Sequence, residues 1–152
     1  MADQITFRDF QSADRAACLA LFDANCPEFF AANERADYLA FLHLAPAGYE
    51  VCLQGAAIVG AFGLILDQRA ASLRWILFDP KWQGRGIGTR TMRRVLEAAA
   101  ARGATALLIA ASHRSEPFFV RFGAGRVKYT ADGWGPGMHR ADLVIQLDHD
   151  QR

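Results

Sequence analysis

The sequence predicts a single α/β domain over residues 1–152, in which a mixed β-sheet is flanked by helices. Its 152 residues, 52% of them hydrophobic and 22% charged, have the size and balance of one globular domain. No low-complexity tract, long linker or internal repeat divides the chain. Segments with the two-residue period of strands are interspersed with segments of helical period, and such elements pack together in layers.

The first part of the chain is expected to form one strand and two helices. Apolar residues alternate over residues 4–8, which predicts a short strand. Ser12 has the residue type that caps a helix, and the helix after it has to end before Pro27. A second helical pattern runs over residues 33–44 and ends before Pro46.

Three strands are expected next. Residues 49–53 and 58–66 are typical of a hairpin around Gly55. Residues 71–78 are apolar on both faces, so this strand is expected to be central and covered on both sides. Alternation along it would place two sets of side chains on opposite faces, Leu73, Trp75 and Leu77 on one and Ile76 and Phe78 on the other.

The second half of the chain contains the clearest helical pattern, over residues 86–102. Its apolar positions repeat at helical spacing, and Gly103 ends the pattern. Residues 105–111 are apolar on both faces, which predicts another buried strand. The remaining elements are expected to be a short helix near 116–121 and two strands, 126–130 and 138–147.

Charge is distributed unevenly along the chain. Residues 1–75 carry nine acidic and five basic side chains, a net charge of −4, whereas residues 76–152 carry seven and twelve, a net charge of +5. Five of these cations and no acidic residue lie between Pro80 and Arg94. The second half is therefore expected to bind an anion. The near-neutral total argues against nucleic acid as a partner, because that partner needs a broader basic surface.

The cysteines and the apolar stretches bear on the compartment. The chain has three cysteines, Cys18, Cys26 and Cys52, and no two of them form a Cys-x-x-Cys pair. Three cysteines are too few for a disulfide framework, which favours a reducing compartment. Residues 1–4 lack the features of a secretory signal, and the longest uncharged apolar stretch, 51–66, is shorter than the ~20 residues of a membrane helix. We therefore expect a cytoplasmic protein with no membrane partner. The scattered histidines predict no metal site.

The strongest motif lies between the central strand and the amphipathic helix, at residues 79–89. Gly84, Gly86 and Gly88 remove Cβ atoms where the backbone turns, so that successive N–H groups face one anion. The following helix adds the positive end of its dipole. The glycine spacing fits neither a dinucleotide loop nor a P-loop, which disfavours both kinds of site. The alternative is a strand-to-helix turn that needs positive φ and binds nothing.

The loop sequence Gln83-Gly84-Arg85-Gly86-Ile87-Gly88 resembles the Gln/Arg-x-x-Gly-x-Gly/Ala signature of the GCN5-related N-acetyltransferase (GNAT) family. The order of elements is also similar to that family's over essentially the whole chain. The resemblance implies a GNAT-like, mostly antiparallel sheet and a site for acetyl-coenzyme A (acetyl-CoA). It implies that the pyrophosphate is bound by the loop and the helix start, at Gln83, Gly84, Arg85, Gly86, Ile87, Gly88 and Thr89.

In that family the strand before the loop splays from its neighbour, and pantetheine lies in the gap like an extra strand. The resemblance therefore implies backbone hydrogen bonds from Ile76 and Phe78 to the cofactor. The physical reason is general, because an unpaired strand backbone is a template for a ligand that carries amides.

Residues 115–124 resemble the family segment that ends in Tyr-x-x-x-Gly-Phe. Phe119 takes the position of the tyrosine, whose hydroxyl often protonates the departing thiolate, and a phenyl ring cannot do this. Ser112 stands where many relatives have an asparagine that binds the cofactor chain. The resemblance thus implies that both residues lie beside the cofactor. A thiol with a pKa near ~8.5 leaves readily, so the loss of one general acid need not abolish transfer.

Two residues are candidates for removing the acceptor's proton. Glu28 lies between the first two expected helices, which in this family border the acceptor site; the alternative is a solvated loop acid. His113 follows a buried strand at its C-terminal end, where ligand sites gather and an imidazole can transfer protons; the alternative is a surface histidine. Trp134 is expected on a loop over 132–139, either as a wall of the acceptor pocket or as a homodimer contact.

The resemblance implies an acetyl-CoA-dependent N-acetyltransferase that acts on a primary amine of a small molecule or peptide by direct attack in a ternary complex. An acetyl-enzyme intermediate is disfavoured, because no cysteine has a base placed beside it. The alternative is a non-catalytic acyl-CoA-binding regulatory module of the same fold. The sequence alone leaves the identity of the acceptor open.

Overall fold

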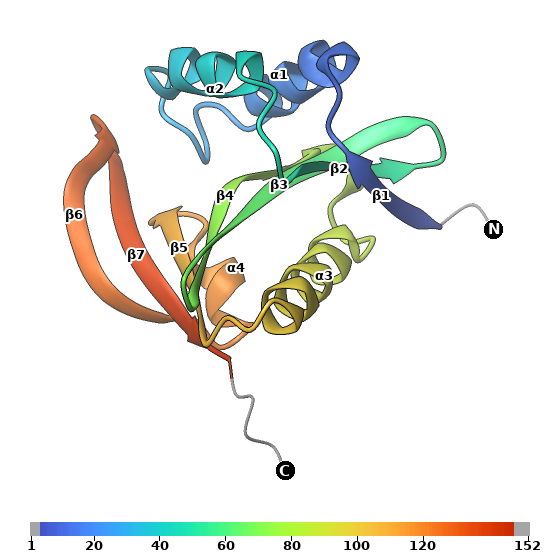
Figure 1. Ribbon diagram of the computed structural model, residues 1–152. Coiled ribbons are helices and arrows are strands. Elements are labelled where there is room, and N and C mark those ends of the chain that lie inside the picture. The colour runs from blue at the N-terminus through green and yellow to red at the C-terminus, as the bar shows by residue number, and fades with distance from the viewer. Residues whose placement is uncertain (1–3, 148–152) are drawn as a thin grey trace.

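The central element is a seven-stranded β-sheet (Figure 1), described by a computed structural model over residues 4–147. Its strands are β1 (Ile5–Asp9), β2 (Tyr49–Gln54), β3 (Ala57–Asp67), β4 (Ala70–Phe78), β5 (Ala106–Ser112), β6 (Gly125–Gly135) and β7 (Met138–Gln146). They lie in the order β1-β2-β3-β4-β5-β7-β6. Only β4 and β5 run parallel to each other, and all other neighbours are antiparallel. The expected mixed, mostly antiparallel sheet is confirmed.

Helices cover both faces of this sheet (Figure 1). They are α1 (Arg15–Ala24), α2 (Glu34–His43), α3 (Ile87–Ala101) and α4 (Glu116–Val120). The first two lie on one face and the last two on the other, so each amphipathic element buries its apolar side against the sheet. Among residues 4–147, no helix is long and apolar enough to cross a bilayer.

Two apolar cores lie on opposite sides of the sheet. The core beneath α1 and α2 is rich in aromatic rings and includes Phe22, Tyr38 and Tyr49, all fully or almost fully buried. The core beneath α3 and α4 is built mostly from aliphatic side chains, such as Val95 of α3, with Met92 of the same helix and the ring of Phe119 among them. Because β4 contributes to both cores, the expectation that it is central and covered on both sides is confirmed.

Strand β4 contains a β-bulge that reverses its alternation. Ala61 of β3 pairs with Leu77, but Gly63 pairs with Arg74, so β4 has one residue more than β3 at this point. Trp75 lies in the bulge with a φ of +44°. Leu73 consequently packs toward α3, whereas Trp75 and Leu77 pack toward α1 and α2. The expected grouping of these three side chains on one face is therefore wrong.

The N-terminal cap of the first helical segment also differs from the expectation. The segment begins with a 3-10 turn at Ser12–Asp14 that leads into α1. Ser12 is not the capping side chain, because the Asp14 carboxylate accepts the Gln11 N–H at 2.8 Å. The same carboxylate receives the Arg8 guanidinium at 2.8 and 3.0 Å, which lowers the pKa of Asp14. A carboxylate ion held in this way is a stronger acceptor than a hydroxyl.

Strand β6 is longer than the sequence predicts. Instead of a loop over 132–139, the strand continues to Gly135 and turns directly into β7, with an irregular register after Thr130. A Cβ at Gly135 would lie 2.8 Å from the Cβ of Ala31, so the glycine lets the hairpin pass close to the α1–α2 connection. The hairpin thereby reaches the face of the sheet that α1 and α2 cover.

A buried pair of tyrosines supports the bulge in β4. The Tyr49 hydroxyl donates to the Trp75 carbonyl oxygen at 2.6 Å and lies 2.7 Å from the Tyr38 hydroxyl. Burial raises the pKa of both phenols, so they stay neutral and act as hydrogen-bond donors. The strained residue Trp75 is thus tied through its carbonyl group to β2 and, through Tyr38, to α2.

We expect Tyr49→Phe to lower the free energy of unfolding by about 1–3 kcal/mol, because it leaves a buried carbonyl group and a buried hydroxyl without their partner. Urea denaturation measures the loss. Tyr129→Phe is the matched control, since Tyr129 is 43% exposed and its hydroxyl forms no hydrogen bond within residues 4–147. Equal effects of the two substitutions would show that the tyrosine pair does not hold the bulge.

Candidate active site

The main opening in the sheet lies between β4 and β5. Within the described chain these strands pair only over Ala70–Leu73 and Ala106–Ile109, and beyond Leu73 they separate. On the other side of β4, the Asp79 N–H donates to the Val59 carbonyl oxygen at 2.8 Å. Because antiparallel bonds alternate along a strand, the main-chain groups of Ile76 and Phe78 face the separated edge. This is the splay that the family resemblance implied.

The side chain of Asn25, at the end of α1, reaches the same edge. Its Nδ2 donates to the Phe78 carbonyl oxygen at 2.8 Å and to the Leu21 carbonyl oxygen at 2.8 Å. The Phe78 carbonyl therefore has a protein partner, and its N–H remains directed to the gap. Sequence reasoning missed Asn25, because its only local signal is a polar residue just past the end of a helix.

The glycine-rich loop leads into α3 through two left-handed residues. Gly84 has a φ of +83° and Gly86 a φ of +81°, a conformation that side-chain-bearing residues rarely adopt. The first bond of the helix runs from the Arg90 N–H to the Gly86 carbonyl oxygen at 3.0 Å, and no side chain caps the helix. In the described chain, the N–H groups of residues 87–89 thus have no acceptor. They form a positively polarised donor set suited to an anion.

The expected loop side chains differ in exposure. Gln83 and Arg85 are exposed, and the Arg85 guanidinium lies 4.7 Å from the centre of the Trp82 ring. Ile87 points the other way and packs against Cys52 and Val59. The main chain of Ile87, together with the main chains of Gly88 and Thr89, is available to an anion. The loop therefore provides the Arg85 guanidinium on an aromatic support beside a row of N–H groups.

Gly88 allows a close approach by α4. A Cβ at Gly88 would lie 2.8 Å from Cε1 of Phe118, whose ring also meets that of Phe78 edge to face at 5.9 Å. Phe119, in contrast, is 3% exposed and belongs to the core beneath α3 and α4. The neighbouring Phe118 is thus a ring that lies beside the loop and the edge of β4, and the expected place of Phe119 beside the cofactor stays a prediction.

The side chain of Ser112 has a local role at the end of β5. Its Oγ accepts the Ser115 N–H at 3.1 Å and lies 3.1 Å from the Ser115 Oγ. The Ser112 N–H in turn donates to the Ser115 Oγ at 3.2 Å. These bonds form the turn that starts α4. The hydroxyl that the resemblance assigned to the cofactor is therefore already bonded within the protein.

Three segments meet on the α1–α2 side of the splay. The Trp134 indole N–H donates to the Ala111 carbonyl oxygen of β5 at 3.0 Å, and the Asn33 side chain donates to the Trp134 carbonyl oxygen at 2.9 Å. Across the gap, the ring of Phe30 lies 6.1 Å from that of Trp75 in the β4 bulge. The tip of the β6–β7 hairpin and the α1–α2 connection therefore form a wall around the open ends of β4 and β5.

The two residues expected to accept the proton, Glu28 and His113, lie in different surroundings. Glu28 lies in this connection but is exposed, and it forms no hydrogen bond within residues 4–147. His113 lies at the end of β5, where its Nδ1 accepts the His139 backbone N–H at 3.1 Å. In the neutral ring the proton is then on Nε2, so neither nitrogen has a free lone pair for a substrate proton.

Glu34, the first residue of α2, is the buried carboxyl group of this wall. It is 5% exposed, and its Oε2 accepts the Ala31 N–H at 2.8 Å. Burial raises the pKa of Glu34 to about 7, opposed by the Ala31 hydrogen bond and aided by the negative charge of Asp37. Sequence reasoning missed this residue. Its signal is a glutamate at the start of a helix, on the same face as Tyr38 and Leu42.

A comparison with known families identifies this architecture. Residues 18–124 match the model of the acetyltransferase (GNAT) family, which is most of the chain and includes the loop and the splayed strands. The chain belongs to the GNAT family. It is thus an acetyltransferase, and the resemblance found in the sequence is confirmed. No curated protein matches this acetyltransferase in sequence.

Solved structures similar to this acetyltransferase support the fold. Ard1 from Thermoplasma volcanium has a TM-score of 0.80 and 14% identity, covering 98% of this chain and 100% of that one. The ribosomal-protein-S18-alanine N-acetyltransferase from Escherichia coli has a TM-score of 0.77 and 11% identity, with coverages of 98% and 99%. For yncA from Salmonella typhimurium, solved with its cofactor acetyl-CoA, the TM-score is 0.70 at 15% identity, with coverages of 98% and 97%.

We expect the stability of the acetyltransferase to report the titration of Glu34. Between its ordinary value of 4.5 and its folded pKa of about 7, the unfolded chain loses this proton while the folded protein keeps it. Rising pH therefore destabilises the folded protein across this window. Glu34→Gln does not titrate, so its unfolding free energy should gain about 3 kcal/mol over that of the wild type between about pH 4 and pH 8.

Urea unfolding of both proteins at several pH values measures this difference. A difference that stays constant with pH would show that Glu34 titrates as an ordinary carboxyl group.

Proposed function

We propose that this acetyltransferase transfers the acetyl group of acetyl-CoA to a primary amine by direct attack within a ternary complex. One observation carries the proposal: the unpaired edge of β4 leads directly to the uncapped start of α3. An elongated ligand with amide groups at one end and phosphates at the other fits this succession of sites. Acetyl-CoA has this chemistry, and yncA, which shares the fold, was solved with it.

The diphosphate is assigned to the start of α3. The N–H groups of Ile87, Gly88 and Thr89 donate to its oxygens, and the left-handed glycines Gly84 and Gly86 keep Cβ atoms away from them. Arg85 adds a positive charge from its position on the Trp82 ring. Gln83 lies at the outer edge of the loop.

The pantetheine arm is assigned to the edge of β4. The main chain of Ile76 and the N–H of Phe78 pair with its amides as β5 would if the two strands stayed together. The ring of Phe118 covers this stretch. The acetyl group then lies near the bulge at Trp75, inside the wall formed by the hairpin tip and the α1–α2 connection.

The reaction needs orientation more than strong chemical assistance. The neutral amine forms a bond to the acetyl carbon, the carbonyl oxygen takes up negative charge, and an N–H of the β4 edge stabilises that charge. The C–S bond then breaks and the thiolate leaves. Phe118 and Phe119 have no hydroxyl to protonate it, so the proton reaches the sulfur from the amine or from water. A thiol of ordinary acidity leaves without a dedicated acid.

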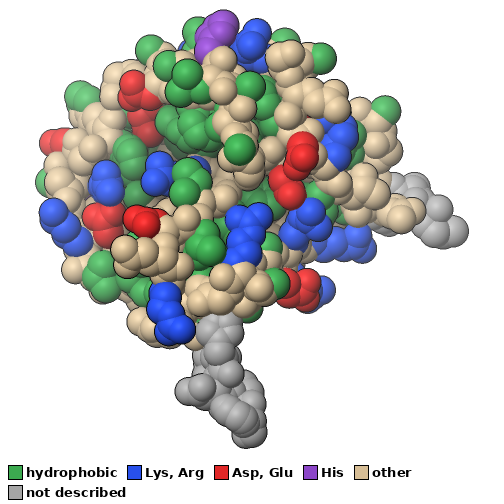
Figure 2. All heavy atoms as spheres, viewed as in Figure 1, with side chains coloured by type: hydrophobic (Ala, Val, Ile, Leu, Met, Phe, Trp, Pro, Cys, Tyr) green, Lys and Arg blue, Asp and Glu red, His purple; other side chains and the backbone are tan. Residues whose placement is uncertain are grey.

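The acceptor is proposed to be the amine of a small molecule or a peptide rather than a nucleic acid. Among the proteins of similar fold, one is named as the ribosomal-protein-S18-alanine N-acetyltransferase, whose acceptor is an amine of a protein. Figure 2 shows acidic and basic side chains interspersed with apolar ones on one face of the molecule. A surface that binds the phosphate backbone of a nucleic acid would instead be basic over a broad area.

The direct test is to incubate the protein with acetyl-CoA and a panel of amines, amino acids, aminoglycosides and peptides, and to follow free thiol. Acceptor-dependent release of thiol supports the transferase. Tight binding of acetyl-CoA without release for any acceptor would favour the alternative, a non-catalytic acyl-CoA-binding module of the same fold.

We expect Gly86→Val to abolish acetyl-CoA binding, measured by calorimetry. The φ of +81° strains any branched residue, and the side chain would stand where phosphate approaches the N–H groups. Gly103→Val is the matched control at the other end of α3, because Gly103 has a φ of +84° and equally open surroundings. If folded Gly86→Val and Gly103→Val bind acetyl-CoA with similar affinity, the loop is not part of the cofactor site.

We expect Arg85→Ala to weaken acetyl-CoA binding about 10- to 150-fold, the effect of losing one charge-assisted hydrogen bond to a phosphate. Added salt should weaken the wild type in the same direction. Arg93→Ala serves as the control, because Arg93 is exposed further along the same helix. If both variants lose the same affinity, the cations act through diffuse attraction and Arg85 makes no specific contact.

A further inference from the structure

The buried carboxylate of Glu34 is only partly used by the protein. Its Oε2 accepts the Ala31 N–H at 2.8 Å, whereas its Oε1 has no hydrogen-bond partner within residues 4–147. In that part of the chain, the polar side-chain atoms that have neither solvent contact nor a hydrogen bond are Arg15 Nε and Thr91 Oγ1. Glu34 Oε1 is not one of them, so it retains some contact with solvent. One oxygen of a buried acid is thus available to another molecule.

Within residues 4–147, no cation forms an ion pair with this acid. Its neighbour Arg35 binds Asp23 through two hydrogen bonds of 2.8 and 3.1 Å, and no ion pair within residues 4–147 includes Glu34. Asp37 on α2 helps to raise the pKa of Glu34, and the charge of Glu34 in turn helps to raise the pKa of the Cys26 thiol in the α1–α2 connection. A buried carboxylate without a positive partner is costly, and a glutamine could also accept the Ala31 N–H without that cost.

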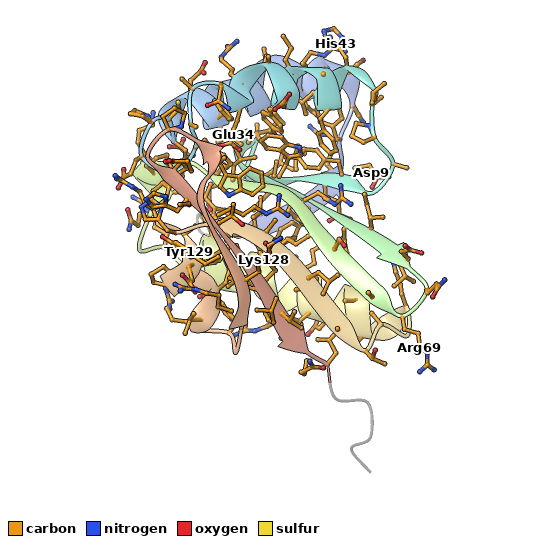
Figure 3. The ribbon with its side chains drawn as sticks, turned by 90° about the vertical axis from the view of Figure 1, so that its left-hand side faces the viewer. Asp9, Glu34, His43, Arg69, Lys128 and Tyr129 are labelled. Atoms are coloured by element: carbon orange, nitrogen blue, oxygen red, sulfur yellow. The ribbon has the colours of Figure 1, made fainter. Side chains whose placement is uncertain are left out.

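The position of Glu34 connects it to the open ends of β4 and β5. Glu34 and Tyr38 lie one turn apart on the buried side of α2, and the Tyr38 ring lies 4.8 Å from that of Trp75 in the β4 bulge. The preceding residue, Asn33, bonds to the Trp134 carbonyl at the hairpin tip. In Figure 3, Glu34 lies at the start of α2 beside the upper end of this hairpin. The carboxylate is therefore part of the wall around the acetyl position.

We propose that Glu34 is the residue that takes the proton from the acceptor ammonium group. The inference rests on the proposed function, since it assigns a role at the same site. The Oε1 atom accepts one proton from the bound ammonium and leaves a neutral amine. The amine nitrogen bonds to the acetyl carbon, the C–S bond breaks, and the second nitrogen proton reaches the thiolate. The Glu34 proton then passes to water, so one proton is released for each amide formed.

The surroundings give this carboxyl group a suitable basicity. Because burial raises its pKa to about 7, it is a better proton acceptor than a solvated glutamate and is still partly ionised at neutral pH. As the pH falls through about 7, Glu34 becomes protonated and can no longer accept a proton. The rate at saturating acetyl-CoA should therefore decrease on the acid side with this group's titration.

The test is Glu34→Gln, which keeps an oxygen for the Ala31 N–H but cannot take a proton. The rate of acetyl transfer at a fixed amine concentration should fall about 10²- to 10⁴-fold, the range for a general base, with unchanged affinity for acetyl-CoA. The acid limb near pH 7 should disappear from the profile. Asp37→Asn is the matched control on the exposed side of α2. It should retain the plateau rate of the wild type and move the acid limb only to slightly lower pH, because the negative charge of Asp37 helps to raise the pKa of Glu34.

Glu34→Asp supplies a second readout. It keeps a carboxylate with a lower intrinsic pKa, so it should retain part of the rate and move the acid limb to lower pH. An acid limb that stays in place in both variants would overturn the inference and leave Glu34 a purely structural residue. That result differs from failure of the proposed function, in which the wild type itself would release no thiol with any amine.

Discussion

The separation of β4 from β5 is the constraint on which the rest of the structure depends. Two neighbouring parallel strands are hydrogen-bonded for four residue pairs and then diverge in the middle of a sheet. Main-chain groups left without partners are costly, so each strand needs a secure neighbour on its other side. The antiparallel partners β3 and β7 provide these neighbours. The sheet can therefore expose part of an inner edge while its two halves stay formed.

Around that edge, side chains from distant parts of the sequence fix the direction of the backbone. Tyr49 of β2 binds the carbonyl of Trp75, and Asn25 at the end of α1 binds the carbonyl of Phe78. Both contacts occupy carbonyl groups on β4. The α1–α2 unit is thus attached to the strand that it covers through polar bonds as well as through aromatic packing, and its wall keeps a fixed relation to the exposed edge.

The sequence predicts the order and type of the elements well, because periodicity and Gly or Pro boundaries are local signals. It also predicts the loop, whose alternating glycines are required by backbone geometry at Gly84 and Gly86. The bulge at Trp75 escapes prediction, since it arises from pairing with β3. Phe118 and Phe119 are adjacent rings that only packing distinguishes. Glu34 is an ordinary helix-start glutamate in the sequence, and its burial becomes apparent only in the tertiary structure.

The three tryptophans of the chain are all placed around this one region. Trp82 lies under the Arg85 guanidinium, Trp75 lies in the bulge, and Trp134 bonds to the end of β5. Each occupies a different part of the proposed site: the phosphate end, the acetyl position and the outer wall. The tryptophan fluorescence of the protein therefore comes from this one region, and selective excitation of tryptophan follows events there without any attached label.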